Sequence, residues 1–141
     1  MAATTLFELV SPERLFFSQA VEMVVVPGTE GDFGALPGHM PKLATVRPGV
    51  IVIFENGQPK ERIFVAGGFA EVTEEACTVL AEEAALVSDL QPQAAEARFA
   101  KAEAAYAAFA SSGEGEKDAI ERELAVAAAM LAAAKGEFAY H

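Results

Sequence analysis

The sequence predicts a β plus α fold: an N-terminal antiparallel β-sandwich, or flattened barrel, over residues 1–88, followed by an antiparallel two-helix hairpin over residues 89–141. Short apolar runs recur at regular spacing through the first part and are separated by turn residues, which is typical of a sandwich. The second part is rich in alanine, with 19 alanines in residues 92–141 against 11 in residues 1–91. Because alanine has the highest helix propensity, this change in composition indicates helices.

The strands are expected where apolar runs stand between turn signals. Asn56–Gly57 is the strongest hairpin signal, because both central positions of a type I′ turn require positive φ. A second hairpin is expected around the turn Thr73–Ala76, and Ser11–Pro12 ends the first strand. The expected strands cover residues 6–10, 14–17, 21–26, 50–54, 62–66, 69–73 and 77–81.

The stretch from Pro27 to Gly49 differs from the rest, because it holds five of the eleven glycines and four of the seven prolines. Glycine permits positive φ, whereas proline fixes φ and removes a hydrogen-bond donor. This density predicts a rigid, repeatedly turning loop rather than regular structure. A shaped loop on a β scaffold is a frequent place for function, but the same residues would also serve as tight corners of an all-β domain.

Two apolar stripes at helical spacing predict the hairpin, and a break at residues 111–115 separates them. Asp89 is expected to cap the first helix, and Pro92 to lie in its first turn. The stripes contain only six large side chains, so we expect a mobile element whose position depends on a neighbour. The stripes consist of Phe99, Ala102, Tyr106 and Phe109, then Ile120, Leu124, Ala127 and Leu131.

Charge and apolar content exclude several classes of function. The formal net charge is −11, which makes nucleic acid and anionic lipid surfaces unfavourable partners. No apolar run approaches the ~18 residues that span a bilayer, and the first residues, MAATTLFELV, lack the basic and apolar regions of a signal peptide. With a single cysteine, no intrachain disulfide can form. We expect a soluble chain in a reducing compartment, connected to a membrane only through other proteins.

Residues suited to catalysis or metal binding are few. The chain has two histidines, His39 and His141, and one cysteine, Cys77, which together cannot form a His/Cys metal cluster. No Gly-Lys-Ser/Thr follows the glycine-rich segment 28–34, so the signature of a phosphate-binding loop is absent. We assign no catalytic residue, cofactor or metal, and we expect Cys77 to be a small buried hydrophobe.

Two motifs stand in order along the chain. They are Pro27-Gly28, Gly31, Gly34, Pro37, His39, Pro41 with Pro48-Gly49, and then Gly67-Gly68-Phe69-Ala70-Glu71-Val72. The first resembles the PG-x-x-G-x-x-G-x-x-P-x-H-x-P core and closing PG pair of the ε-subunit family of the bacterial rotary (F-type) ATP synthase, and the second resembles that family's GGF-x-EV segment. The resemblance covers essentially the whole chain, including its length and its alanine-rich tail.

The resemblance implies a non-catalytic subunit of the central stalk, which transmits rotation of the proton-driven c-ring to the catalytic head. It implies that the sandwich docks against the γ subunit and sits on the c-ring, at the cytoplasmic face of the bacterial inner membrane. The residues implied by motif are Thr29, Glu30, Gly31 and Asp32 for the c-ring, and Ser11, His39 and Met40 for γ. The two acidic residues of the loop would suit basic or amide partners, or would only solvate the loop.

The hairpin departs from the family pattern in two respects. ATP-binding relatives resemble one another in an acidic residue and an Arg-Ala pair at the start of the first helix, where this sequence has Gln91, Ala94 and Ala95; we therefore predict weak or absent ATP binding. Inhibitory tails present basic residues to the catalytic α and β subunits, whereas residues 116–141 carry three basic and five acidic residues. These features favour rotary coupling with weak regulation of ATP hydrolysis. The alternative is an independent β-sandwich module that binds a ligand or peptide beneath a helical lid.

Overall fold

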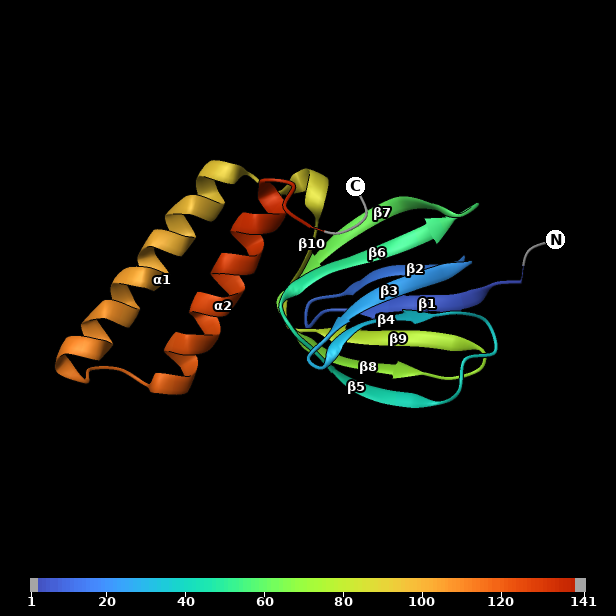
Figure 1. The fold of residues 1–141 in the computed structure, drawn as a ribbon, viewed down its shortest axis with the longest axis horizontal. Helices are drawn as coiled ribbons and strands as arrows, with labels where there is room; N and C mark the ends of the chain where they lie inside the picture. Colours follow the sequence, from blue (N-terminus) through green and yellow to red (C-terminus); the bar gives the residue numbers. More distant parts are fainter. Residues whose placement is uncertain (1–2, 139–141) are drawn as a thin grey trace.

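The computed structural model describes residues 3–138 as a β-sandwich with a helical hairpin packed at one end (Figure 1). This arrangement confirms the fold class that the sequence predicts. The strands are β1 (Thr5–Val10), β2 (Leu15–Val21), β3 (Met23–Gly28), β4 (Gly31–Ala35), β5 (Lys42–Val46), β6 (Gly49–Glu55), β7 (Gln58–Val65), β8 (Gly68–Val72), β9 (Ala76–Ala81) and β10 (Ala84–Leu86). A short 3-10 helix, η1 (Val87–Asp89), precedes the helices α1 (Pro92–Ser112) and α2 (Lys117–Ala134).

The strands form one sheet that folds over on itself. Hydrogen bonding gives the order β10-β7-β6-β3-β5-β8-β9-β1-β2, with β4 paired to β3 outside this path. Neighbouring strands are antiparallel except β1 and β9, which are parallel. The last strand of the path, β2, contacts β6 across the fold, so the sheet is a flattened, nearly closed barrel.

Alternating apolar side chains fill the interior of this barrel. In β1, for example, Phe7 and Leu9 are fully buried, whereas Leu6 is exposed on the other face. Because side chains alternate between the faces of a strand, the same pattern in the other strands builds one continuous core. Cys77 lies in that core with no exposed surface, as expected. Other fully buried members are Val24, Val26, Ile51, Ile53, Ile63, Val65 and Val79.

Residues 27–49 are more regular than the sequence predicts. Strands β4 and β5 run through this stretch, so the expectation of a continuous irregular loop is wrong. Much of the glycine and proline stands at strand ends: Pro27–Gly28 ends β3, Gly31 begins β4, and Pro48 separates β5 from β6. Strands as short as these two contain too few residues for an alternating pattern to stand out among the turn signals.

The two hairpin turns predicted from the sequence are confirmed. Asn56 and Gly57 have φ angles of 54° and 72°, and positive φ at both is what a type I′ turn between β6 and β7 requires. Between β8 and β9, Thr73 donates its backbone N–H to Ala76 O at 2.8 Å, and the Thr73 hydroxyl accepts the Ala76 N–H at 3.1 Å. Strand boundaries are predicted less well, because β2 continues to Val21 and β10 has no expected counterpart.

The start of α1 also differs from the expectation. Asp89 ends η1 instead of capping α1, so that prediction is wrong. Gln91 is extended, makes no side-chain capping bond and directly precedes Pro92 at the first position of α1. A residue before proline disfavours the helical conformation, which places the helix start at the proline itself. At the other end, Gly113 has a φ of 74° and ends α1 in the left-handed conformation.

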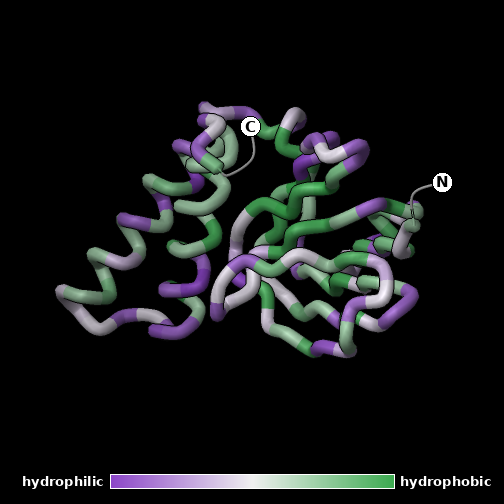
Figure 2. The backbone as a smooth tube through the Cα atoms, turned by 45° about the vertical axis from the view of Figure 1, so that its right-hand side comes forward, coloured by the Kyte–Doolittle hydropathy of each residue, from purple (hydrophilic) through white to green (hydrophobic). Residues whose placement is uncertain are grey.

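The apolar contact between the hairpin and the sandwich is made by α2, and α1 packs on the outer side of α2 (Figure 1). Val126 and Ala133 of α2 pack with Phe64 and Ala66 of the sandwich. None of the six large side chains of the predicted stripes is buried, and alanines make up most of the buried helix positions. Figure 2 shows the same contrast between strongly hydrophobic strands and a hairpin of mixed hydropathy. The thin apolar seam expected from the sequence is present, and the mobility of the hairpin stays a prediction.

Candidate functional site

The turn between β3 and β4 carries the residues Thr29–Asp32 that were expected to face a partner. Gly28 and Gly31 pair across this hairpin, which leaves Thr29 and Glu30 at its tip. Gly31 has a φ of 131°, a conformation that other residues rarely adopt, and a Cβ on Gly28 would lie 2.7 Å from Gly31 O. Both positions therefore require glycine, and together they determine the path of the turn.

Two backbone hydrogen bonds hold this turn against the end of β5. Thr29 donates its N–H to Thr45 O, and Arg47 donates its N–H to Pro27 O, both at 2.9 Å. These bonds flank the point at which β3 passes β5, where Gly28 pairs with Val46. The turn is thus a supported corner of the sheet rather than a free loop.

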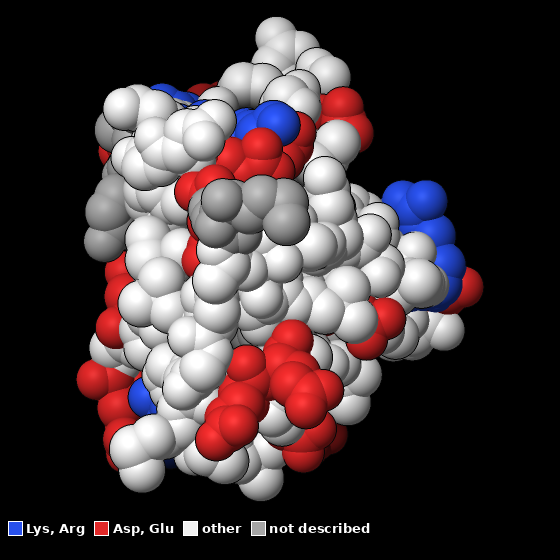
Figure 3. Space-filling view, turned by 90° about the vertical axis from the view of Figure 1, so that its right-hand side faces the viewer, with Lys and Arg blue, Asp and Glu red and all other residues white. Residues whose placement is uncertain are grey.

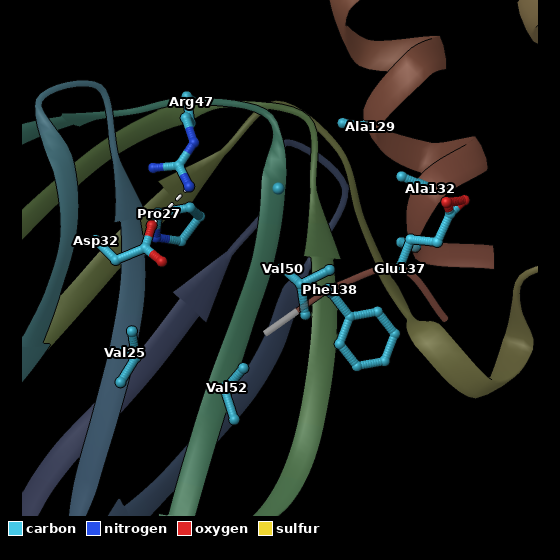
Figure 4. A pocket seen from close by; sticks show the side chains of 12 residues that line it. Val25, Pro27, Asp32, Arg47, Val50, Val52, Ala129, Ala132, Glu137 and Phe138 are labelled. Atoms are coloured by element: carbon cyan, nitrogen blue, oxygen red, sulfur yellow. Dashed lines mark hydrogen bonds and ion pairs between the residues drawn. The ribbon is translucent and has the colours of Figure 1, made fainter. Parts of the chain in front are cut away.

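The side chain of Arg47 adds a third support. Its guanidinium donates to Gly28 O through Nη1 and to Asp32 Oδ1 through Nη2, both at 2.6 Å. Figure 4 shows Arg47 reaching over Pro27 towards Asp32. Sequence reasoning missed Arg47, since the only signal was an isolated basic residue fifteen positions from an acidic one.

The three other residues of the expected site, Ser11, His39 and Met40, lie at opposite ends of the sandwich. Ser11 directly follows β1, whereas His39 and Met40 lie between β4 and β5. Strand β1 is parallel to β9, and β8 is antiparallel to both β9 and β5, so β1 and β5 run in the same direction. The structure therefore does not gather these residues at one point. Ser11 shares its end of the sandwich with the Thr29–Asp32 turn.

The outer sheet face between the two ends carries several exposed apolar side chains. Phe69 of β8 pairs with Leu80 of β9, and Leu80 pairs with Val10 of β1, so the three side chains share the outer face. Phe69 is 59% exposed, Leu80 54%, Leu43 of β5 76% and Met40 80%. Large apolar side chains gathered on one sheet face at such exposure mark interaction surfaces. A polar row of Glu71, Thr78 and Glu8 crosses the same face between them. Sequence reasoning missed this face because β8 and β9 carry apolar residues on both faces.

A cavity of about 250 Å³ separates the turn from the docked end of α2. Val50 and Val52 line its wall on the sandwich, and Ala129 and Ala132 line its wall on the helix (Figure 4). The ion pair between Arg47 and the turn also lines this cavity. The turn and the hairpin are therefore close neighbours in the docked form.

The end of the sandwich away from the hairpin is acidic. Figure 3 views this end and shows more acidic than basic side chains on it, with several carboxylates gathered together. The turn between β8 and β9 contributes the exposed Glu74 and Glu75. Such a surface repels nucleic acid and anionic lipid, in keeping with the net charge of −11.

Chemical groups for other kinds of site are sparse in the part of the chain that the structure describes. Among residues 3–138, no group of three or more His, Cys, Asp or Glu could hold a metal ion, and no helix is long and apolar enough to cross a membrane. His39 is half-buried in its connection, and His141 lies outside the described residues. At the start of α1, Gln91 and Ala94 are exposed and Ala95 is buried.

Comparisons with known protein sequences agree over nearly the whole chain. Residues 4–108 match the family described as ATP synthase, Delta/Epsilon chain, beta-sandwich domain. The chain is 57% identical over 136 residues to the ATP synthase epsilon chain of Rhodospirillum rubrum. The alignment covers 96% of this chain and 100% of that relative. It is 46% identical over 135 residues to the ATP synthase epsilon chain of Granulibacter bethesdensis. That alignment covers 96% of this chain and 99% of the relative.

A solved structure shares the fold. One chain in the cryo-EM structure of the Euglena gracilis mitochondrial ATP synthase, OSCP/F1/c-ring in rotational state 1, superposes with a TM-score of 0.74. The alignment covers 93% of this chain and 81% of that one, at 20% sequence identity. The arrangement of sandwich and hairpin is thus one already seen in a rotary assembly.

Proposed function

Because the chain belongs to the ATP synthase delta/epsilon family, as an epsilon chain, we propose that it acts in the central stalk of a bacterial rotary ATP synthase. It is a stalk subunit rather than a catalytic one, and it couples proton-driven rotation of the c-ring to ATP synthesis. The observation that carries this proposal is the 57% identity to an epsilon chain over nearly the full length of both proteins. The alternative of an independent ligand-binding sandwich with a helical lid is not favoured, because nothing in that reading accounts for this similarity.

The γ subunit would occupy the exposed apolar face of β5, β8, β9 and β1. Ser11 lies at one end of this face and Met40 at the other, so a partner lying along the strands touches both positions that the resemblance implies. Phe69 and Leu80, towards the Ser11 end of the face, are more than half exposed in the free chain. Burial of apolar side chains is the dominant favourable term in most protein–protein association.

The c-ring would meet the turn Thr29–Asp32. A contact that transmits torque must resist sideways displacement, and this turn is supported by two backbone bonds and by the Arg47 side chain. The turn lies at the same end of the sandwich as Ser11, so the ring and γ would share one corner of the molecule. Through these two partners the chain would be held at the cytoplasmic face of the inner membrane as a peripheral subunit.

The hairpin would act as a separate unit from about residue 89 and as a weak regulator of ATP hydrolysis. In the docked form α2 packs on the sandwich through Val126 and Ala133. Its charge does not favour docking to an acidic surface of the α and β subunits.

A rebuilt catalytic complex should therefore hydrolyse ATP at a similar rate with the full chain and with residues 1–91. A severalfold higher rate with the shorter chain would show that the hairpin inhibits.

Binding of γ to the apolar face can be tested with one substitution. Phe69→Glu places a carboxylate beside the exposed Leu80 and should weaken γ binding by about 2 kcal/mol or more, roughly thirtyfold. Gln58→Glu adds the same group at an exposed position of β7, outside this face, and should bind γ normally. Co-purification and titration with γ measure both. If Phe69→Glu binds γ normally and its circular dichroism spectrum is unchanged, γ does not bind this face.

A further inference from the structure

We propose that Arg47 is the residue that positions the ring-facing turn, and that Glu30 is the carboxylate of that turn left unpaired to meet the partner. This inference rests on the proposed function. It starts from the geometry around Asp32, whose Oδ1 accepts a hydrogen bond from Arg47 Nη2 at 2.6 Å. The same guanidinium holds Gly28 O at 2.6 Å.

Arg47 joins the three segments that meet at this corner. Its backbone belongs to the connection that leaves β5, its Nη1 reaches the end of β3 at Gly28, and its Nη2 reaches the start of β4 at Asp32. A planar guanidinium can hold two acceptors at once in fixed directions, which the single ammonium of lysine does less well. The side chain is therefore a cross-brace between the two strands of the hairpin and the strand behind them.

The brace matters because the turn is flexible by composition. Gly28 and Gly31 flank its tip, and glycine has more accessible backbone conformations than any other residue. The Arg47 and Asp32 side chains are 43% and 42% exposed, so their ion pair adds little to the stability of the whole fold. Its effect is local: it restricts movement of the turn Thr29–Asp32 when a partner pushes on the turn sideways.

The two carboxylates of the turn have different roles as a result. Asp32 is engaged by the guanidinium, whereas Glu30 stands exposed at the tip and has no hydrogen bond or ion pair within residues 3–138. A free carboxylate on an ordered turn suits a partner that presents hydrogen-bond donors, such as a basic side chain or backbone and side-chain amides. The Asp32 side chain stays 42% exposed, so Arg47 orients this carboxylate without removing it from the surface, and Glu30 is the one left unpaired by the brace.

Amide hydrogen exchange of the full-length protein tests the brace by itself. Arg47→Gln removes the positive charge and the guanidinium bonds to Gly28 and Asp32. We expect the backbone amides of residues 29–32 to exchange roughly tenfold faster in this variant. Asp32→Asn should act in the same direction, whereas Glu30→Gln should leave exchange unchanged. Lys60→Gln is the matched control, because it breaks the 2.7 Å Lys60–Glu55 ion pair at another surface position. Exchange at the wild-type rate in Arg47→Gln would overturn the inference.

A second measurement tests the role of the turn in the assembled ATP synthase. Protons pumped per ATP hydrolysed should fall by at least twofold with Arg47→Gln and with Glu30→Gln, and should stay at the wild-type ratio with Lys60→Gln. Wild-type coupling in Glu30→Gln would overturn the assignment of Glu30 to the ring. If exchange rises in Arg47→Gln but both turn variants pump normally, the brace exists and the ring contact lies elsewhere, which would contradict the proposed function at this site.

Discussion

Arg98 of α1 forms an ion pair with Glu83, in the turn between β9 and β10, with Nη1–Oε2 at 2.9 Å and Nη2–Oε1 at 3.2 Å. The same guanidinium donates through Nε and Nη2 to Glu123 of α2, at 2.8 and 2.9 Å. One side chain thus ties both helices to the sandwich. Because the apolar seam of the hairpin consists mainly of alanine, this double fork is a substantial part of what fixes its docked position.

Removal of Arg98 should loosen the hairpin without unfolding the sandwich. Arg98→Gln is expected to lower the free energy of opening of α1 and α2 by about 1–2 kcal/mol, since the fork is charge-assisted but partly exposed. Amide exchange over residues 92–134 measures the change. Arg122→Gln, which removes the same charge from an exposed position of α2, is the control and should have little effect. Equal exchange in the two variants would show that the fork does not hold the hairpin.

The fork also predicts a dependence on pH. The hydrogen bond from Arg98 holds the pKa of Glu123 below the ordinary value of 4.5, so the docked form favours the charged carboxylate. The resulting stabilisation is complete above that ordinary value and is lost as the pH falls through the lowered pKa. The stability difference between wild type and Glu123→Gln should therefore be constant near neutral pH and shrink in acid. A difference that grows as the pH falls below 4.5 would contradict this assignment.

The contact between α2 and the sandwich offers a sharper way to release the hairpin. Ala133 is 1% exposed and packs with Phe64, which is fully buried. Ala133→Glu would bury an unpaired carboxylate, and undocking of α2 avoids that cost. Limited proteolysis should then cleave the hairpin at least tenfold faster while the strands stay intact. Ala128→Glu, at an exposed position of the same helix, should be cleaved like wild type.

Cys77 should be chemically inert in the folded protein. Burial in the core raises the pKa of its thiol to about 12, so the reactive thiolate is scarce at neutral pH. A thiol reagent at pH 8 should label Cys77 only as fast as the sandwich unfolds, and should label it rapidly in denaturant. Rapid labelling of the native protein would mean that the strand β9 opens locally.

Local signals in the sequence were sufficient for most of the fold. Asn56–Gly57 required positive φ at both positions, and the change in alanine content marked the helices, so these predictions hold. Predictions failed where the structure of a segment depends on a neighbouring residue or strand. Asp89 has the chemistry of a helix cap, yet the restriction that Pro92 places on its predecessor moves the helix start beyond it. The strands β4 and β5 form because β3 and β8 are available to pair with them.

The candidate site shows the same division. The motif located Thr29–Asp32, and the structure places these residues in one supported turn. The partner of Asp32 could not be found from the sequence, because Arg47 reaches it only after β3, β4 and β5 have been brought together. The exposure of Phe69 is likewise a property of the closed barrel, since sequence alone does not distinguish the outer face of β8 from the inner one.

The central claim, that one corner of the sandwich meets the c-ring and one sheet face meets γ, is tested most directly by cross-linking in the assembled ATP synthase. Because Cys77 is buried, Glu30→Cys and Met40→Cys each introduce a single accessible thiol for a short photoreactive cross-linker. We predict that the probe at position 30 attaches to the c subunit and the probe at position 40 attaches to γ. Attachment of both probes to the same partner, or of neither to these two, would contradict the account.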